Sequence, residues 1–377
     1  MPPAVWAVRA KEPEAAVVRI HYMRKTLAAL LFALSAAPAF AAIQDDAGAA
    51  FERDAAAIPA ALRRNPLDLP TIPVSHQEIS EEMDSPSREV WFSWAPTAEH
   101  PHPDARGVFH VFDSPETRSE PLVLLLPMTG DPNHGVIRGF CRYMYRNGFR
   151  CAYMERILPD AEDLPATLDG LFTLPGLPPY SAETARHGLD ALEEMGILRP
   201  GEKVGVGGIS MGAIDAALLA ATDKRVGAVV MLLGGGDVPK ILANIHGPGV
   251  REFAQKREEQ MKKNHWDLDE FKRQMAEKTW TGDPLVYFTD PELRLNKELR
   301  ADHFLMINVK GDQAIPNECT SELVDALSRL DGTRPDNRML HLPYLPKGYR
   351  HIGVILRLHY ARSRMLQHFE RFLADNH

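Results

Sequence analysis

The sequence predicts an α/β fold in which a mostly parallel central sheet is flanked by helices. Wholly apolar runs, such as residues 121–127 and 226–233, are typical of strands that are covered on both faces. Segments with a helical pattern separate these runs, and such alternation indicates βαβ units. The stretch 203–219 is a third indication, because an apolar strand, a glycine turn and an alanine-rich helix follow one another in it directly. At 377 residues, 45% of them hydrophobic, the chain can form a sizeable core.

The elements are expected in the following order. Residues 88–94 and 107–112 alternate apolar with polar side chains, as half-buried strands do, and the loop between them predicts an antiparallel pair. The later strands are predicted from apolar runs between helical segments: 121–127, 148–154, 204–209, 226–233, 304–309 and 338–342. The helices are predicted at 136–147, at 181–195 with Ser181 as the N-cap, at 213–221, at 321–330 and at 354–374.

The series of strands and helices is interrupted over about 241–300. Within this insertion, residues 250–278 are charged and helical, with few apolar positions besides Trp266 and Phe271. An insertion between late strands commonly lies over the carboxyl ends of a parallel sheet, so we predict a helical cap that shapes a pocket there. The alternative is a solvated helix pair unconnected with any site, and the sequence does not decide between the two.

The first 41 residues have the three parts of a secretory signal peptide. Met23-Arg24-Lys25 begins a positive segment, residues 26–35 form an apolar core, and Ala39-Phe40-Ala41 is a small-x-small cleavage pattern. The apolar run is too short to span a bilayer, and no cysteine lies at the cleavage site for a lipid anchor. Cleavage after Ala41 predicts a periplasmic or secreted protein. For residues 1–22 we expect either that translation starts at Met23 or that the positive segment is over-long.

The rest of the chain is expected to form a leader and a main domain. Residues 42–84 are rich in alanine, proline and charge without a strong period, and we expect one or two short helices there. The main domain is expected over 85–377, including the cap. A net charge of −8 and a pI near 6.0 indicate no basic surface for nucleic acid, so nucleic-acid binding is not expected.

The chain contains three cysteines, Cys141, Cys151 and Cys319. An odd number leaves at least one free thiol in a monomer. Export leads to an oxidising compartment, so a bridge between Cys141 and Cys151 is compatible with the expected location, although their spacing does not establish it. No cysteine or histidine cluster has the spacing of metal ligands, and no metal site is predicted.

The stretch on which the chemistry depends is the turn Gly208-Ile209-Ser210-Met211-Gly212. A strand precedes it and a helix follows it, which is the context of a nucleophile elbow with the serine hydroxyl exposed at the strand tip. In so sharp a turn, a side chain at either glycine would collide with neighbouring backbone. The five-residue pattern alone also fits a glycine-rich turn with a capping serine, but the flanking strand and helix favour the elbow.

A serine hydroxyl needs a base to take its proton and an acid to orient that base. In this architecture the acid and then the base follow the serine along the chain, each after a different strand. Asp312 follows the strand 304–309 by three residues, and His351 lies in the loop after the last strand. Both positions therefore fit the acid and the base.

Each of these residues also has a simpler interpretation. Asp312 could cap the turn that follows it, and His351 could be an ordinary loop histidine, but their places after two strands favour the catalytic roles. Asp237, after the preceding strand, is a reserve acid, and His134 and His246 are weaker reserve bases.

In these pieces the chain resembles the α/β-hydrolase superfamily, and more loosely its dienelactone-hydrolase and esterase branches. The matching segments are the turn around Ser210, residues 311–316 and the loop around His351, and the resemblance spans about 88–377. It implies that Ser210 is the nucleophile, that His351 is the general base and then the general acid, and that Asp312 is the orienting carboxylate.

The resemblance also implies an oxyanion hole made of two backbone N–H groups. One is expected from Met211, and the other from Met128 or Thr129 in the loop after the strand 121–127. The sequence departs from the family in this loop, because Pro127-Met128 replaces the usual His-Gly. Met128 still has the backbone N–H that the role requires.

The sequence thus predicts an exported serine hydrolase that cleaves a carboxylic ester, or an amide or thioester, through an acyl-enzyme on Ser210. The expected partner is a small-molecule ester or acyl substrate; no metal, organic cofactor or stable membrane span is implied, and no oligomeric state is predicted. The alternatives are a non-catalytic binding module on the same scaffold and a peptidase, for which residues 42–120 are too short to form the usual N-terminal propeller. Candidate pocket residues are Glu155, Arg156, Tyr180, Trp266 and Tyr287.

Overall fold

A computed structural model describes residues 76–78, 81–82, 85–93, 106–114, 117–128, 134–155, 173–247, 251–279, 282–343, 350–353 and 357–373. The chain divides into two compact units, Met1–Gln44 and Asp45–His377, and every described residue belongs to the second. The predicted signal peptide, 1–41, and most of the predicted leader therefore lie outside the described residues.

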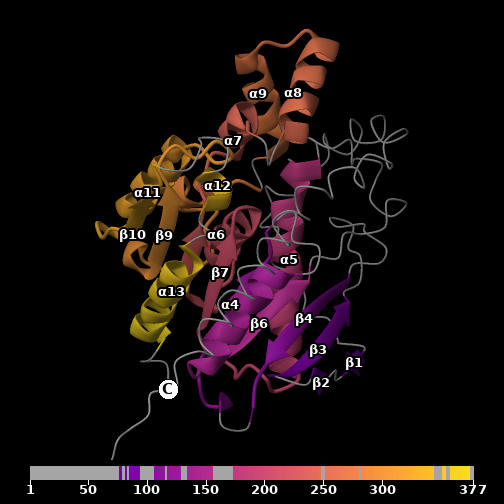
Figure 1. Ribbon diagram of the computed structural model, residues 1–377, viewed down its shortest axis with the longest axis vertical. Coiled ribbons are helices and arrows are strands. Elements are labelled where there is room, and N and C mark those ends of the chain that lie inside the picture. The colour runs from indigo at the N-terminus through magenta and orange to yellow at the C-terminus, as the bar shows by residue number, and fades with distance from the viewer. Residues whose placement is uncertain are drawn as a thin grey trace, which may run out of the picture. The chain divides into compact units, whose positions relative to one another are not determined.

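The core of the second unit is a mixed sheet with the strand order β1-β3-β4-β6-β5-β7-β8-β9-β10. Figure 1 shows β10 and β9 toward one edge of this sheet and β4, β3 and β1 toward the other. Its strands are β1 (His76–Glu78), β3 (Ser85–Ser93), β4 (Arg106–Phe112), β5 (Leu122–Leu126), β6 (Arg150–Glu155), β7 (Val204–Ile209), β8 (Val226–Leu232), β9 (Phe304–Val309) and β10 (Asp336–Leu340). From β6 to β10 all neighbours are parallel, whereas β3 and β4 form the expected antiparallel pair and β4 is antiparallel to β6. The predicted mostly parallel sheet is confirmed.

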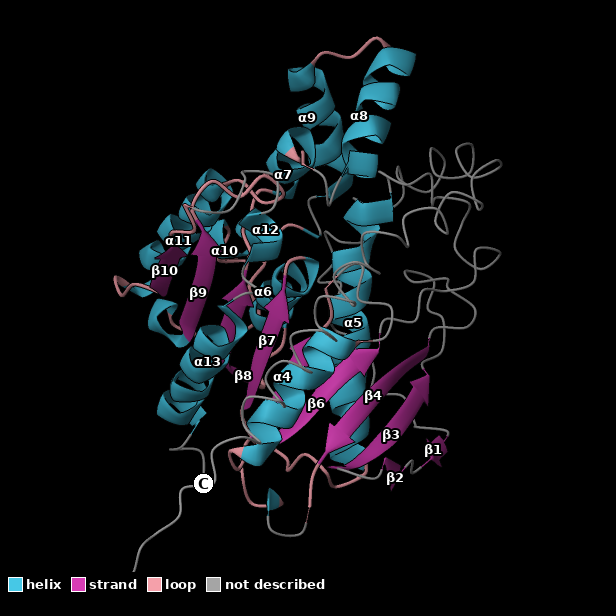
Figure 2. Ribbon diagram, in the orientation of Figure 1, coloured by secondary structure: helices cyan, strands magenta, loops and turns pink. Residues whose placement is uncertain are grey.

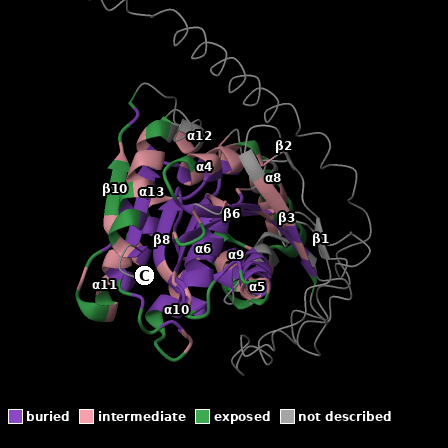
Figure 3. Ribbon diagram, turned by 90° about the horizontal axis from the view of Figure 1, so that it is seen from below, coloured by how far each residue is buried: buried purple, intermediate pink, exposed green. Residues whose placement is uncertain are grey.

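Helices cover both faces of the sheet because each buried strand presents apolar side chains to both sides. In β5, Leu122, Leu124 and Leu126 belong to one core cluster, while Val123 and Leu125 belong to the other. The first cluster contains side chains of α5 (Thr173–Glu194), α6 (Met211–Thr222), α10 (Pro284–Thr289) and α11 (Asn317–Asp331); the second contains those of α4 (Gly135–Arg146) and α13 (Leu358–Leu373). Figure 3 shows the buried residues concentrated in α6 and the middle strands, while β10 is mostly exposed.

One helix begins earlier than the sequence predicts. The expected start was Ser181 as an N-cap, but α5 begins at Thr173 and contains Pro178 and Pro179. Both prolines lie in the second turn of α5, where a proline has a helical φ but no N–H to donate to the carbonyl four residues before it. Ser181 lies inside the helix and is buried, so the prediction of a cap at this residue was wrong.

The insertion between β8 and β9 forms α7 (Val238–Asn244), α8 (Arg251–Asn264), α9 (Leu268–Thr279) and α10. Figure 2 shows α8 and α9 beyond the arrowheads of β7 and β9, at the carboxyl end of the sheet. Phe271 and Met275 of α9 are fully buried in a third core cluster, which also contains Ile214 of α6 and Ile315 of the loop after β9. The insertion therefore packs against the two segments that follow β7 and β9.

The leader contributes to the sheet at its first described residues. β1 and β2 (Glu81–Glu82) both pair with β3 in antiparallel fashion. Cys141, Cys151 and Cys319 are all free and buried in the structure, so the bridge considered between the first two is not formed there.

Candidate active site

Ser210 lies at the sharp turn between β7 and α6. Its φ of 56° and ψ of −118° are angles that residues with a side chain rarely adopt. The turn is held by the Ser210 N–H, which donates to the Leu232 carbonyl at 2.8 Å, and by the Ala213 N–H, which donates to the Ser210 carbonyl at 2.9 Å. The backbone of Ser210 is therefore hydrogen-bonded both to the carboxyl end of β8 and to the first turn of α6.

The two glycines of the turn are required by backbone contacts. A Cβ on Gly208 would lie 1.9 Å from the Gly212 carbonyl oxygen, and a Cβ on Gly212 would lie 2.3 Å from the Leu126 carbonyl oxygen. Such distances allow no side chain without moving the backbone. The expected reason for both glycines is confirmed, and the second contact shows that the turn packs directly against the end of β5.

His351 lies against Ser210. It belongs to α12 (Arg350–Gly353), and its Nε2 is 3.0 Å from the Ser210 hydroxyl oxygen. Its Nδ1 is 2.7 Å from Oδ2 of Asp312. A carboxylate can only accept, so Nδ1–H donates to Asp312 and Nε2 is left to accept the serine proton. The structure thus joins three residues from positions 210, 312 and 351 in one chain of hydrogen bonds.

Asp312 uses its two oxygens for different purposes. While Oδ2 binds His351, Oδ1 accepts hydrogen bonds from the backbone N–H groups of Ala314 at 2.8 Å and Ile315 at 3.2 Å. The residue therefore caps its own turn and also orients the imidazole. The side chain of Asp312 is 1% exposed and that of His351 is 16% exposed, so the acid is shielded from water while the base remains accessible.

Arg350 is part of this arrangement and was missed by the sequence reasoning. Its Nη1 donates to the Lys310 carbonyl at 3.2 Å and lies 2.4 Å from where a Cβ on Gly311 would be. Gly311 has a φ of 73°, which also favours glycine. The guanidinium therefore fastens the helix that carries His351 to the loop that carries Asp312. The only signal in the sequence is the Arg-His dipeptide, which does not reveal this contact.

The expected oxyanion donors lie at the junction of β5, β7 and α6. Met211 is the first residue of α6, where backbone N–H groups have no partner within the helix. Met128 is two residues beyond the end of β5, beside the backbone on which Gly212 packs. Thr129 lies outside the described residues. Met211 and Met128 are therefore placed on adjacent segments that meet at the Ser210 turn.

Asp237, the reserve acid, has another role in the structure. It is the N-cap of α7, where its Oδ1 accepts from the Lys240 N–H at 3.0 Å. Burial raises its pKa, which disfavours the charged form. Since Nδ1 of His351 binds Asp312, Asp237 is not the carboxylate that orients this imidazole.

The reserve bases and the pocket candidates are spread over several elements. His134 is the N-cap of α4, and its ring lies 6.0 Å from that of Tyr153, while Nδ1 of the exposed His246 is 2.7 Å from the Asn244 carbonyl oxygen. Glu155 is hydrogen-bonded to His110 at 2.9 Å, and this contact lowers its pKa.

Three other pocket candidates are placed by the structure. Tyr287 is buried in the first core cluster, where burial raises its pKa to about 12, so it belongs to the core. Trp266 packs partly buried against the third cluster, and Tyr180 against the first. Arg156 lies outside the described residues.

Neither a metal cluster nor a membrane span is found in the part of the chain that the structure describes. No group of three or more His, Cys, Asp or Glu side chains is arranged there to hold a metal ion. Among the same residues, no helix combines the length and the apolar character that crossing a bilayer requires.

Comparisons with solved structures find proteins of partly similar structure at low sequence identity. No protein-family model matches the chain, and no curated protein matches it. An esterase of Pyrococcus furiosus has 13% identity and a TM-score of 0.48, over 80% of this chain and 97% of the other. A dienelactone hydrolase of Anabaena variabilis has 15% identity and a TM-score of 0.42, over 76% and 99%.

An acylaminoacyl peptidase of Pyrococcus horikoshii has 14% identity and a TM-score of 0.46, over 77% of this chain but only 42% of the peptidase. At such values these similarities carry no argument about the reaction. The argument about fold rests on the chain itself: a mixed sheet parallel from β6 to β10, covered by helices on both faces, with a serine at the strained turn after β7. These features are those of the α/β-hydrolase fold.

Proposed function

We propose that this protein is a serine hydrolase that cleaves carboxylic esters through an acyl-enzyme formed on Ser210. The observation that carries the proposal is the chain of hydrogen bonds from Ser210 through His351 to Asp312, with distances of 3.0 and 2.7 Å. A structural serine does not require a base on its hydroxyl and a buried acid behind that base. A reactive one does.

The reaction follows from the positions of the protons. As Ser210 Oγ attacks the ester carbonyl carbon, its proton passes to Nε2 of His351, and the resulting imidazolium is stabilised by Asp312. The negative oxygen of the tetrahedral intermediate accepts hydrogen bonds from the N–H groups of Met211 and of Met128 or Thr129. Collapse expels the alcohol, which takes the proton from Nε2, and water then repeats the sequence to release the acid.

Replacement of the nucleophile tests the proposal. Ser210→Ala should lower turnover of a p-nitrophenyl ester by about four to six orders of magnitude, because the remaining groups cannot replace an activated nucleophile. The matched control is Ser328→Ala, since the Ser328 hydroxyl only donates to the Val324 carbonyl within α11. Unchanged turnover in Ser210→Ala would refute the assignment.

A fluorophosphonate probe separates an enzyme from a binding module on the same scaffold. The wild type should be labelled on Ser210, and Ser210→Ala should not be labelled at all. A wild type that folds but is neither labelled nor active on esters of varied acyl length would be a binding module. Parallel assays with matched amides and thioesters then rank the three kinds of acyl substrate.

We further propose that the protein is exported to the periplasm or secreted. The support is the order of positive segment, apolar core and Ala39-Phe40-Ala41 cleavage pattern in the first 41 residues. N-terminal sequencing of the mature protein should begin at Ala42. A mature chain that retains Arg24 would contradict the proposal.

A further inference from the structure

A cavity of about 380 Å³ lies between α10, the segment after it and the last turn of α11. Its lining combines apolar and positively charged side chains: Phe288, Thr289, Pro291, Arg294, Arg329 and Leu330. Cavities of this size accommodate small organic ligands. Its composition suggests a ligand that is both apolar and negatively charged.

This cavity is remote from Ser210 by topology. Residues 290–303 lead into the amino end of β9, and Arg329 and Leu330 are at the end of α11 that returns toward β10. Ser210 and Asp312 instead follow the carboxyl ends of the parallel strands β7 and β9. The cavity therefore belongs to the opposite end of the sheet from the candidate active site.

Arg294 is the unusual residue in the lining. It is 8% exposed, and its guanidinium donates from Nη1 to the Leu299 carbonyl at 3.2 Å. Its Nε is buried and has no hydrogen-bond partner within the described part of the chain. No ion pair is recorded for Arg294 among these residues either, although a buried charge is costly unless it is paired and hydrogen-bonded.

One carboxylate acts on Arg294 from a distance. Asp331 affects the Arg294 guanidinium through its charge, while its own oxygens have other partners. Oδ1 accepts from the N–H and the hydroxyl of Thr333, and Oδ2 lies 3.4 Å from Nε of Arg300. Burial lowers the pKa of Arg294 despite this charge, which fits a guanidinium without a close anion.

We propose that the cavity is a binding site for a small carboxylate with a compact apolar body. The carboxylate would accept hydrogen bonds from the Arg294 guanidinium, whose planar N–H groups match two carboxylate oxygens. The apolar body would pack against the partly buried Leu330, beside the wall that Phe288 forms. Thr289, Pro291 and Arg329 are exposed, so they form an entrance from solvent, with a second positive charge at the entrance.

Isothermal titration calorimetry with benzoate tests the proposal, and benzamide is the neutral probe of the same shape. Benzoate should bind the wild type at least about tenfold more tightly than benzamide does, since a hydrogen bond between charged groups contributes that much. Arg294→Met should weaken benzoate binding by at least about tenfold. The matched control is Arg338→Met, which removes an exposed arginine of β10 that pairs with Asp336 and should leave the affinity unchanged.

A second variant keeps the test decisive where Arg294→Met does not fold. Leu330→Trp keeps the arginine but fills the cavity, and it should abolish benzoate binding while ester turnover stays at the wild-type level. Benzoate also resembles an acid product of the proposed reaction, so the variants and not wild-type binding alone decide the outcome. Equal benzoate affinity in wild type and both variants, or equal affinity for benzoate and benzamide, would overturn the proposal.

Discussion

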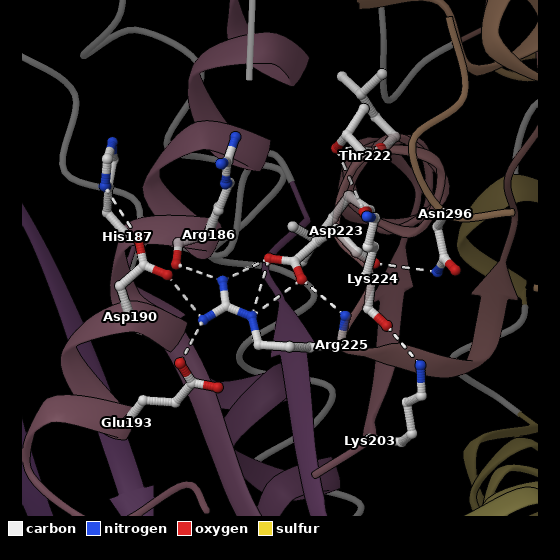
Figure 4. Close-up of polar contacts among 12 residues, drawn as sticks. Arg186, His187, Asp190, Glu193, Lys203, Thr222, Asp223, Lys224, Arg225 and Asn296 are labelled. Atoms are coloured by element: carbon white, nitrogen blue, oxygen red, sulfur yellow. Dashed lines mark hydrogen bonds and ion pairs between the residues drawn. The ribbon is translucent and has the colours of Figure 1, made fainter. Parts of the chain in front are cut away.

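Two clusters of charged and polar side chains lie at opposite ends of the same sheet and are built in opposite ways. At the carboxyl end, Ser210, His351 and Asp312 form a single chain of hydrogen bonds. At the amino end, the Arg225 guanidinium is enclosed by carboxylates of Asp190, Glu193 and Asp223, as Figure 4 shows. In the first cluster each residue is hydrogen-bonded to the next, whereas in the second cluster three carboxylates surround one guanidinium.

The nitrogens of the Arg225 side chain have several partners. Its nitrogens lie 2.6 Å from Asp223, 2.7 Å from Asp190 and 3.5 Å from Glu193, and Nη2 also donates to the Arg186 carbonyl. Burial by itself would lower the pKa of Arg225, but the three carboxylates raise it. A guanidinium that several carboxylates and a carbonyl surround has its N–H groups engaged and none free to react.

The candidate active site differs because its outermost group has only one side-chain partner. The Ser210 hydroxyl is held by His351 alone among the described side chains, at a backbone conformation that costs free energy. Burial occurs in both clusters, since Asp312 and Asp223 are each buried, so burial alone does not distinguish a reactive site. What distinguishes the candidate active site is the Ser210 hydroxyl, which ends the chain of hydrogen bonds and has a base as its partner.

The largest expected effect concerns the acid. Asp312→Asn should lower kcat by about 10⁴-fold, because an amide favours the wrong tautomer of His351. Steady-state kinetics on a p-nitrophenyl ester measure it, with Asp237→Asn as the control that removes a neighbouring carboxylate without touching the imidazole. Equal losses of kcat in the two variants would mean that the hydrogen bond between Asp312 and His351 is not the cause of the loss.

The next effect concerns stability at the amino end. Arg225→Met leaves Asp223 and Asp190 without their central cation, and removing one partner of a buried ion pair commonly costs about 3–5 kcal/mol. The free energy of unfolding, from urea titration, should fall by about 3 kcal/mol, while kcat of the folded protein is retained. Arg338→Met is the control, because its pair with Asp336 is about half exposed and should contribute under about 1 kcal/mol.

The pH dependence of stability should also originate at the amino end. The pKa of His368 is lowered to about 4, chiefly by burial and also by His303 and Arg371, against the opposing effects of a hydrogen bond with the His303 carbonyl and of the Asp336 charge. Between pH 6.5 and 4 the unfolded chain therefore binds a proton that the folded chain does not. The contribution of His368 to the free energy of unfolding is fully present above pH 6.5, and it should fall by about 3 kcal/mol as the pH drops to 4.

Unfolding titrations across this pH range check the expectation. His368→Gln should flatten the acid slope, whereas His359→Gln, on the exposed side of the same helix, should leave it unchanged. A slope that survives in His368→Gln would assign the acid sensitivity to other groups.

The smallest expected effect tests whether catalysis depends on how Arg350 positions the helix that carries His351. Arg350→Ala should lower kcat by up to about 100-fold with little change in KM, because a shift of the His351 helix misaligns the reacting groups. Arg350→Lys should recover part of the loss by reaching the Lys310 carbonyl. Similar kcat in all three proteins, or a loss confined to thermal stability, would show that the contact with Gly311 is only structural.

Much of this molecule could be predicted from local sequence. The apolar runs that became β5, β7, β8 and β9, and the turn around Ser210, are determined by residues close to one another in the chain. Burial on both faces requires unbroken apolar strands, and the turn requires glycine at both of its ends. Because these requirements concern residues that are close in the chain, the strands and the turn can be predicted from the sequence.

The sequence alone could not select among partners that are distant in the chain. Asp237 and Asp312 both follow strands at the carboxyl end of the sheet; the sequence favoured Asp312 and kept Asp237 in reserve, and the tertiary structure joins Asp312 to His351. The same holds for Arg350 on Gly311 and for Arg294, whose unpaired Nε depends on how α10 and α11 pack. Strand order and helix packing decide these contacts, because they bring together segments that no local pattern connects.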